Sequence, residues 1–161
     1  MTLDNWSEFL VAGAGATAAL AGLIIVAMSV NVDLIITIPG MTSRAAAAIA
    51  LLVIGTIALL AGLIPQSLVA YGLEVLVLGT AAAVFAADSM VKVLRARGGA
   101  TLGEAIAKTA VGIIPAGAFL VGGAVLVAGN PEGAIGVAVG TLTAIAVSVV
   151  NAWVVLVEIK R

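Results

Sequence analysis

The sequence predicts an all-α protein, a polytopic transmembrane bundle of five helices, and three observations carry this prediction. Hydrophobic residues make up 63% of the 161-residue chain and charged residues only 9%, with a mean hydropathy of +1.32. A soluble domain carries about 25% charged residues, so this chain has too little polar material to cover a water-facing surface. Its apolar residues form five stretches of bilayer length, about 20 residues each. Five crossings also place every basic residue on one side of the membrane.

The five expected spans fill the chain as a single transmembrane domain. They cover residues 9–30, 44–64, 67–94, 105–129 and 132–159. Asp4 and Glu8 precede the first span in place of Lys or Arg, and its apolar run exceeds the short core of a cleaved signal peptide. We therefore expect the first span to remain in the mature protein.

Signals for helix boundaries support the last two spans. Thr101 and Glu104 fit a capping box at the start of the fourth span. The Asn-Pro-Glu sequence at 130–132 fits the N-cap, the first helical residue and a first-turn carboxylate of the fifth span, which predicts a tight hairpin. Pro115 lies inside the fourth span, where its missing amide donor predicts a kink.

The basic residues predict the orientation of the bundle. With five crossings they all fall on one side: Arg44, Lys92, Arg95, Arg97, Lys108, Lys160 and Arg161. The other side receives Asp4, Glu8 and Glu132. The positive-inside rule then places the N-terminus outside and the C-terminus in the cytoplasm.

Small residues recur on two helix faces, where they predict close helix packing. In the last span Gly136, Gly140, Ala144 and Ser148 are spaced four residues apart, and in the first span Gly15, Ala18, Gly22 and Ser29 share one side. In lipid, close backbone approach through such residues supplies much of the association energy. Two interpretations stay open. The ridges pack the helices inside one protomer, or at least one ridge, above all that of the last span, packs against another copy in a homo-oligomer.

Glu74 is the clearest ionisable residue within a span. It lies about 12 Å along the helix axis from Gln66, with no basic residue expected at that depth. Such a side chain needs a partner, a water path or a neutral state. Glu74 is therefore either a hydrogen-bonded or protonated carboxyl that shares a partner such as Gln66 or Tyr71, or a carboxylate that lines a pore for cations or protons.

Asp88 and Lys92 predict a local ion pair near the inner boundary of the third span. Lys92 lies one helical turn after Asp88, in the favourable order of acid before base. A polar stripe that joins Asp88 to Glu74 is the alternative, because the two residues lie within about 40° of one helix face.

A second polar group is expected at the cytoplasmic end of the bundle. The topology gathers Ser29, Asn31, Arg44, Asn151 and Glu158 there. One interpretation is an interhelical lock, in which Arg44 pairs with Glu158 or Asp88 and the amides bridge helices. The other is an inner vestibule or docking site.

The composition argues against an enzyme, a cofactor site and nucleic-acid binding. The chain has no cysteine and no histidine, which removes disulfides, Cys/His metal sites and histidine catalysis. Glu74 and Asp88 lie about 21 Å apart along one helix, too far for both to act on one water. A net charge of −1 offers no basic field for a nucleic-acid backbone.

Several motifs resemble those of a family of small bacterial multi-span membrane proteins. They are the segment 21–31 (AGLIIVAMSVN), Pro39, the Arg-Ala pair at 44–45, the Pro-Gln pair at 65–66 and the segment 151–159 (NAWVVLVEI). The resemblance covers nearly the whole chain. It implies an integral, multi-pass protein of the bacterial plasma membrane; some members are labelled modulators of a membrane-bound AAA protease. It brings no catalytic residue.

Two functions remain open at the level of the sequence. The first is a homo-oligomeric channel or small transport unit for ions or small solutes, with Glu74 toward the outside and Ser29, Asn31 and Asn151 toward the inside. The second is a noncatalytic accessory or scaffold protein that binds another membrane protein through its Gly/Ala-rich helix faces. We favour the channel slightly, because within its own helix turn Glu74 has no evident partner beyond Tyr71 and Gln66.

Overall fold

A computed structural model describes residues 3–38, 40–95 and 112–158 of the chain. Every element in that part is a helix: η1 (Leu3–Trp6), α1 (Ser7–Ser29), α2 (Val32–Ile35), α3 (Met41–Ala61), α4 (Leu68–Arg95), α6 (Ile113–Val127) and α7 (Gly133–Glu158). The all-α prediction is confirmed.

Four of these helices, α1, α3, α4 and α7, are long and apolar enough to cross a membrane by length and composition. The fifth apolar helix, α6, has 15 residues, which is about 22 Å at the helical rise, against about 30 Å for a hydrocarbon core. The described fold therefore holds four long helices and a shorter one instead of five helices of full length. Residues 105–111 of the expected fourth span lie outside the described residues, as does the expected capping box of Thr101 and Glu104.

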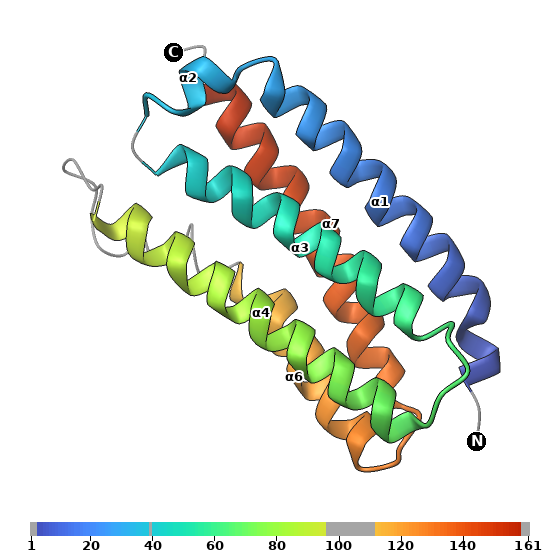
Figure 1. Ribbon diagram of the computed structural model, residues 1–161. Coiled ribbons are helices and arrows are strands. Elements are labelled where there is room, and N and C mark those ends of the chain that lie inside the picture. Colours follow the sequence, from blue (N-terminus) through green and yellow to red (C-terminus); the bar gives the residue numbers. More distant parts are fainter. Residues whose placement is uncertain (1–2, 39, 96–111, 159–161) are drawn as a thin grey trace.

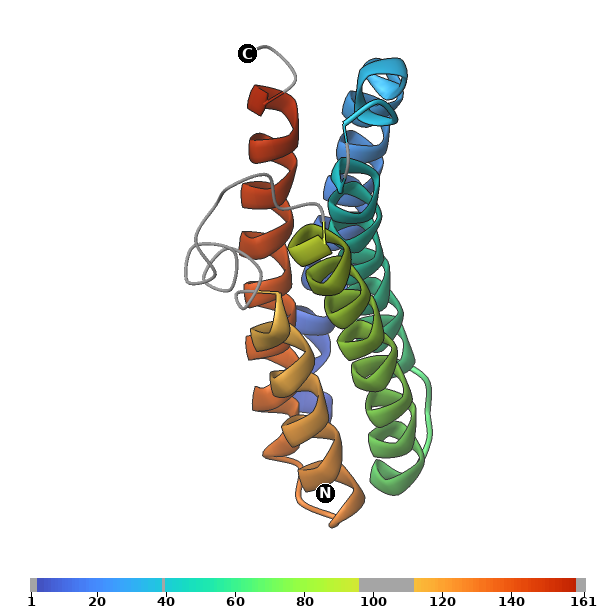
Figure 2. The same cartoon turned by 90° about the vertical axis from the view of Figure 1, so that its left-hand side faces the viewer.

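The helices pack side by side, with α1, α4 and α7 running in one direction and α3 and α6 in the other (Figures 1 and 2). Helix α3 contacts α1, α4 and α7, and α6 packs between α4 and α7. The two ends of the chain lie at opposite ends of the bundle (Figure 1). We call these the N-terminal end, which also holds the α3–α4 and α6–α7 connections, and the C-terminal end, which also holds α2.

The α4–α6–α7 contact depends on neighbouring glycines of α6. A Cβ atom on Gly122 would lie 2.8 Å from the carbonyl oxygen of Gly133 in α7, and one on Gly123 would lie 3.0 Å from the carbonyl oxygen of Gly72 in α4. Real side chains do not fit at such distances, so α6 lies against the backbone of both neighbours. This is the close approach that small residues permit between membrane helices.

Two connections contain glycines with positive φ. Gly40 (φ 85°) precedes α3, and Gly129 (φ 82°) follows α6; this left-handed conformation is open to glycine at little cost. After Gly129, the side-chain oxygen of Asn130 accepts a hydrogen bond from the Glu132 amide at 2.9 Å. The expected tight hairpin is present, with α7 beginning at Gly133.

Pro115 does not interrupt the described part of α6. It is the third residue of that helix, which has Gly112 at its N-cap. Amides in the first helical turn have no partner within the helix, so proline loses nothing there. The kink expected at Pro115 is therefore absent from the described helix, because the described helix begins beside this residue.

Candidate functional site

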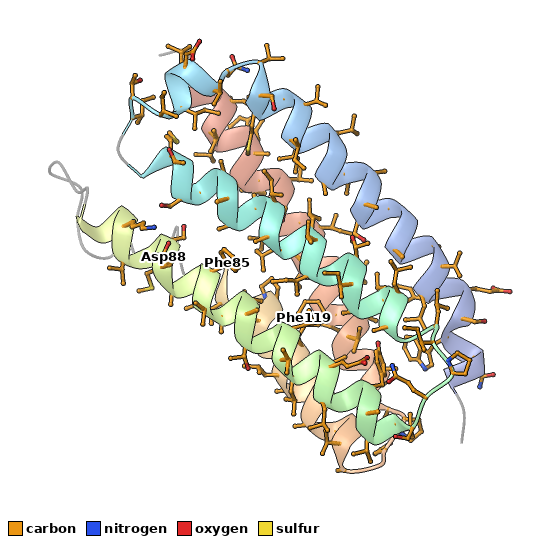
Figure 3. All side chains as sticks on the ribbon, in the orientation of Figure 1. Phe85, Asp88 and Phe119 are labelled. Carbon is orange, nitrogen blue, oxygen red and sulfur yellow. The ribbon has the colours of Figure 1, made fainter. Side chains whose placement is uncertain are left out.

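The interior of the described bundle is filled with apolar side chains. The largest fully buried ones include Tyr71, Phe119, Leu52, Leu59, Leu126, Val75, Val137 and Val155. Figure 3 shows Phe119 at the centre of the bundle, and its ring lies close to Gly140 of α7. The side chains expected to line a pore do not converge in this interior.

Besides Tyr71, three hydroxyl side chains of the described bundle are fully buried among the apolar ones: Thr17, Thr141 and Ser148. Thr17 Oγ1 donates to the carbonyl of Gly13 at 2.8 Å and lies 2.8 Å from Thr56 Oγ1, which joins α1 to α3. The methyl groups of Thr17 and Thr141 both face Gly55 of α3. This threonine contact connects three helices, and no local pattern in the sequence predicts it.

Two further hydrogen bonds join helices through their backbone. Ser148 Oγ of α7 donates to the Ala48 carbonyl of α3 at 2.9 Å, and the Tyr71 hydroxyl of α4 donates to the Ala58 carbonyl of α3 at 3.1 Å. Both side chains are buried. Helix α3 is thus the central acceptor for hydroxyl groups of its neighbours.

The small-residue ridge of α7 packs inside the chain. Gly136 lies against Gly122, Gly140 lies against Phe119, and Ala144 and Ser148 are fully buried. In the described bundle α3 and α6 lie against this ridge, which agrees with the first interpretation. Contact of the ridge with another copy stays a prediction.

The small-residue ridge of α1 is uncovered. Gly15, Ala18, Ala19 and Gly22, which we call the open face of α1, are all exposed. A Cβ atom on Gly15 or Gly22 would meet nothing within 4 Å. The opposite face of α1 is buried against the bundle through residues that include Leu10, Thr17, Ala21, Ile24 and Met28.

Glu74 is exposed on α4 and does not point into the bundle. Gln66 Nε2 donates to Glu74 Oε2 at 2.8 Å, and the same nitrogen donates to the Ala61 carbonyl at 2.9 Å. Of the two partners considered for Glu74, Gln66 makes the contact, whereas the Tyr71 hydroxyl bonds to α3.

Asp88 and Lys92 form an ion pair on the surface of α4. Lys92 Nζ lies 2.7 Å from Asp88 Oδ2, and the two side chains are 53% and 51% exposed, respectively. Figure 3 shows Asp88 one turn after Phe85 on this helix. An exposed pair one turn apart contributes little to stability.

The polar residues of the C-terminal end do not form one shared site in the described part of the chain. Ser29 Oγ donates to the Ile25 carbonyl at 2.7 Å and Asn31 Nδ2 to the Ala27 carbonyl at 2.9 Å. Both therefore satisfy last-turn carbonyls of α1, Ser29 as the last residue of that helix and Asn31 from the connection to α2. Arg44 and Asn151 are half-buried.

The expected pairing of Arg44 with Asp88 is wrong, because Asp88 pairs with Lys92. The side chain of Glu158, the other expected partner of Arg44, lies outside the described part. Among the described residues no cluster of three or more His, Cys, Asp or Glu side chains could hold a metal ion.

Four long apolar helices, an apolar outer surface and an interior joined by hydroxyl-to-carbonyl bonds are the properties of a helical membrane protein. Beyond that class, comparisons of the chain with protein-family models, curated proteins and solved structures gave no match.

Proposed function

We propose that this protein is a noncatalytic accessory or scaffold protein of the bacterial plasma membrane, which binds another membrane protein through the open face of α1. One observation carries the proposal: Gly15 and Gly22 are exposed and have empty space where their side chains would begin. The corresponding ridge of α7 is fully used inside the chain, whereas that of α1 is free for a partner.

The energetics of glycine favour this assignment. A glycine in a helix interior lowers helix stability by about 1 kcal/mol relative to alanine, and contact with lipid does not offset this cost. Contact with a second helix does offset this cost, because small residues let two backbones approach closely. The open face of α1 therefore has the composition of a helix-binding surface.

The proposal includes five crossings with the N-terminus outside and the C-terminus in the cytoplasm. Arg44 lies in the first turn of α3, and Lys92 and Arg95 lie in the last turn of α4, so these three residues are at the C-terminal end of the bundle (Figure 1). Glu8 and Glu132 lie at the N-terminal end, at the start of α1 and in the α6–α7 connection. The positive-inside rule assigns the C-terminal end, which holds these three basic residues, to the cytoplasm.

The test is a photocross-linking residue at Ala19, in the middle of the open face, in native membranes. Wild-type protein is expected to cross-link to a membrane protein, and Gly15→Leu and Gly22→Leu are expected to reduce that product about tenfold by separating the helices. Gly117→Leu in α6 is the matched control, because a Cβ atom there also meets nothing within 4 Å. Equal cross-linking in all variants would contradict the proposal.

A homo-oligomeric channel is the second candidate, and the exposure of Glu74 favours it. The filled interior requires the path of such a channel to run between copies. Purified protein in vesicles should then conduct cations, and Glu74→Gln should reduce the flux. Flux that is absent under every ionic gradient would remove this candidate.

A further inference from the structure

Glu74 lies at a depth where lipid provides no hydrogen-bond donor. The apolar window of α4 runs from Leu68 to Lys92, and Thr80 is its middle residue. Glu74 precedes Thr80 by six residues, about 9 Å along the axis, and half of a hydrocarbon core is about 15 Å. Centred in a bilayer, the helix places the Glu74 backbone inside the hydrocarbon.

The surface around Glu74 is apolar and open. Leu73, Val77 and Val84 are 52%, 70% and 62% exposed on the same side of α4. We call these three residues and Glu74 the acidic flank of α4. In the described part of the chain, Gln66 occupies Glu74 Oε2 and no donor reaches Oε1.

The two basic side chains that the structure describes, those of Arg44 and Lys92, do not lie at this depth. Lys92 lies eighteen residues further along α4, about 27 Å away along the axis, and is paired with Asp88. Arg44 also lies at the C-terminal end. A second copy in the same orientation would place its Arg44 and Lys92 at that same end, so neither of these side chains of a copy would reach Glu74.

We infer that the acidic flank of α4 binds a transmembrane helix of a different protein, one that carries a Lys or Arg side chain in the outer third of its span. This inference deepens the proposed scaffold function and rests on it. A carboxylate within a span requires a compensating group, and a long basic side chain meets that need with a charge-assisted hydrogen bond. The exposed valine and leucine side chains supply the surrounding apolar contact.

The test uses the full-length chain in phosphatidylcholine vesicles with synthetic transmembrane peptides. One leucine-rich peptide carries a single Lys about 9 Å outward from its centre, a second carries Leu at that position, and a third carries the Lys equally far inward. A photocross-linking residue at Val77 reports contact with the acidic flank, and one at Val121 of α6, which is 64% exposed, is the matched control position.

The outer-Lys peptide is expected to cross-link at Val77 about ten times more than the other two peptides, and Glu74→Gln should abolish that preference. Glu132→Gln, which removes an exposed carboxylate at the same end but outside α4, should leave it unchanged. Exchange of charges, with Glu74→Lys and a Glu-bearing peptide, should restore the contact.

Equal cross-linking of the Lys and Leu peptides, or a preference that survives Glu74→Gln, would overturn the inference. So would failure of every peptide to cross-link at Val77. These failures concern α4 alone, whereas failure of the proposed scaffold function appears separately, as cross-linking at Ala19 that Gly15→Leu and Gly22→Leu leave unchanged.

Discussion

The hydroxyl groups buried in this bundle each have a carbonyl or hydroxyl oxygen within hydrogen-bond distance. Thr17 donates to the backbone of its own helix and lies 2.8 Å from Thr56 of α3. A threonine in a membrane helix can satisfy its hydroxyl on the preceding turn alone, as Thr80 does on the carbonyl of Leu76. The contact with Thr56 is therefore an addition that joins two helices.

Thr17→Val tests this interhelical bond with little change of shape. The substitution should destabilise the bundle by about 1 kcal/mol, the size of a hydrogen bond between membrane helices, and Thr56 keeps the Leu52 carbonyl as an acceptor. Unfolding in increasing SDS, followed by circular dichroism, measures the loss. Thr80→Val removes an exposed hydroxyl bonded only within its own helix and should change stability little; equal losses would contradict the account.

The sequence identifies individual polar residues more reliably than their hydrogen-bond or ion-pair partners. The bond from Gln66 to Glu74 was one of the alternatives considered, because both lie close together along one helix and its connection. The ion pair of Asp88 and Lys92 follows from a spacing of four residues. The contact of Thr17 with Thr56 joins positions 39 apart in sequence, and no local spacing carries that information.

At the scale of elements, glycine has opposite roles on α1 and α6. Gly122 of α6 touches the backbone of α7, whereas Gly22 of α1 touches nothing. The sequence predicts close packing from the small-residue ridges of α1 and α7, because small residues allow another helix to approach closely. Which helix approaches a ridge depends on the tertiary arrangement. The sequence therefore leaves open whether the α7 ridge contacts a helix of the same chain or another copy.

Gly122→Ala tests the backbone contact between α6 and α7. The added methyl group would lie 2.8 Å from the Gly133 carbonyl oxygen, so the helices must separate, at a cost of about 1 to 3 kcal/mol. The same SDS unfolding measurement reports it. Gly117→Ala on the same helix meets nothing within 4 Å and should be neutral or slightly stabilising; a neutral Gly122→Ala would show that the two backbones are not in contact.

Gly55→Ala should be tolerated, although Gly55 is buried at the threonine contact. A methyl group there would lie 3.8 Å from Thr17 Cγ2 and 3.9 Å from Thr141 Cγ2, which is ordinary van der Waals contact. Removal of a glycine from a helix interior should then stabilise the protein by up to about 1 kcal/mol. A large loss of stability in SDS unfolding would show that α1 and α7 lie closer to α3 than described.

Helix boundaries were predicted well where long apolar runs end at polar residues. The expected span 67–94 corresponds to Leu68–Arg95, and 132–159 to Gly133–Glu158. The one-turn helix α2 (Val32–Ile35) lies inside an expected loop, because four residues are too few to produce a periodic signal. The described part of the expected span 105–129 corresponds to α6 (Ile113–Val127), and residues 105–111 lie outside the described residues.

At the scale of the whole molecule, charged side chains lie around a bundle whose described interior is apolar. Because apolar side chains fill the described interior, the candidate binding features lie on the outer surface. Two of them lack a partner within the described chain: the open face of α1 and the second oxygen of Glu74. Both features have meaning only if the helices cross the membrane as proposed. The number and direction of the crossings are therefore the central claim.

The absence of cysteine from the sequence allows a direct measurement of this topology. Single substitutions Ser67→Cys and Asn130→Cys place a thiol in the two connections of the N-terminal end, and Thr37→Cys places one in the connection after α2 at the other end; all three positions are exposed. In intact cells a membrane-impermeant maleimide should label the thiols at 67 and 130, and should label the thiol at 37 only after permeabilisation. Labelling of positions 37 and 130 in the same compartment would contradict the five crossings and the two binding surfaces inferred from them.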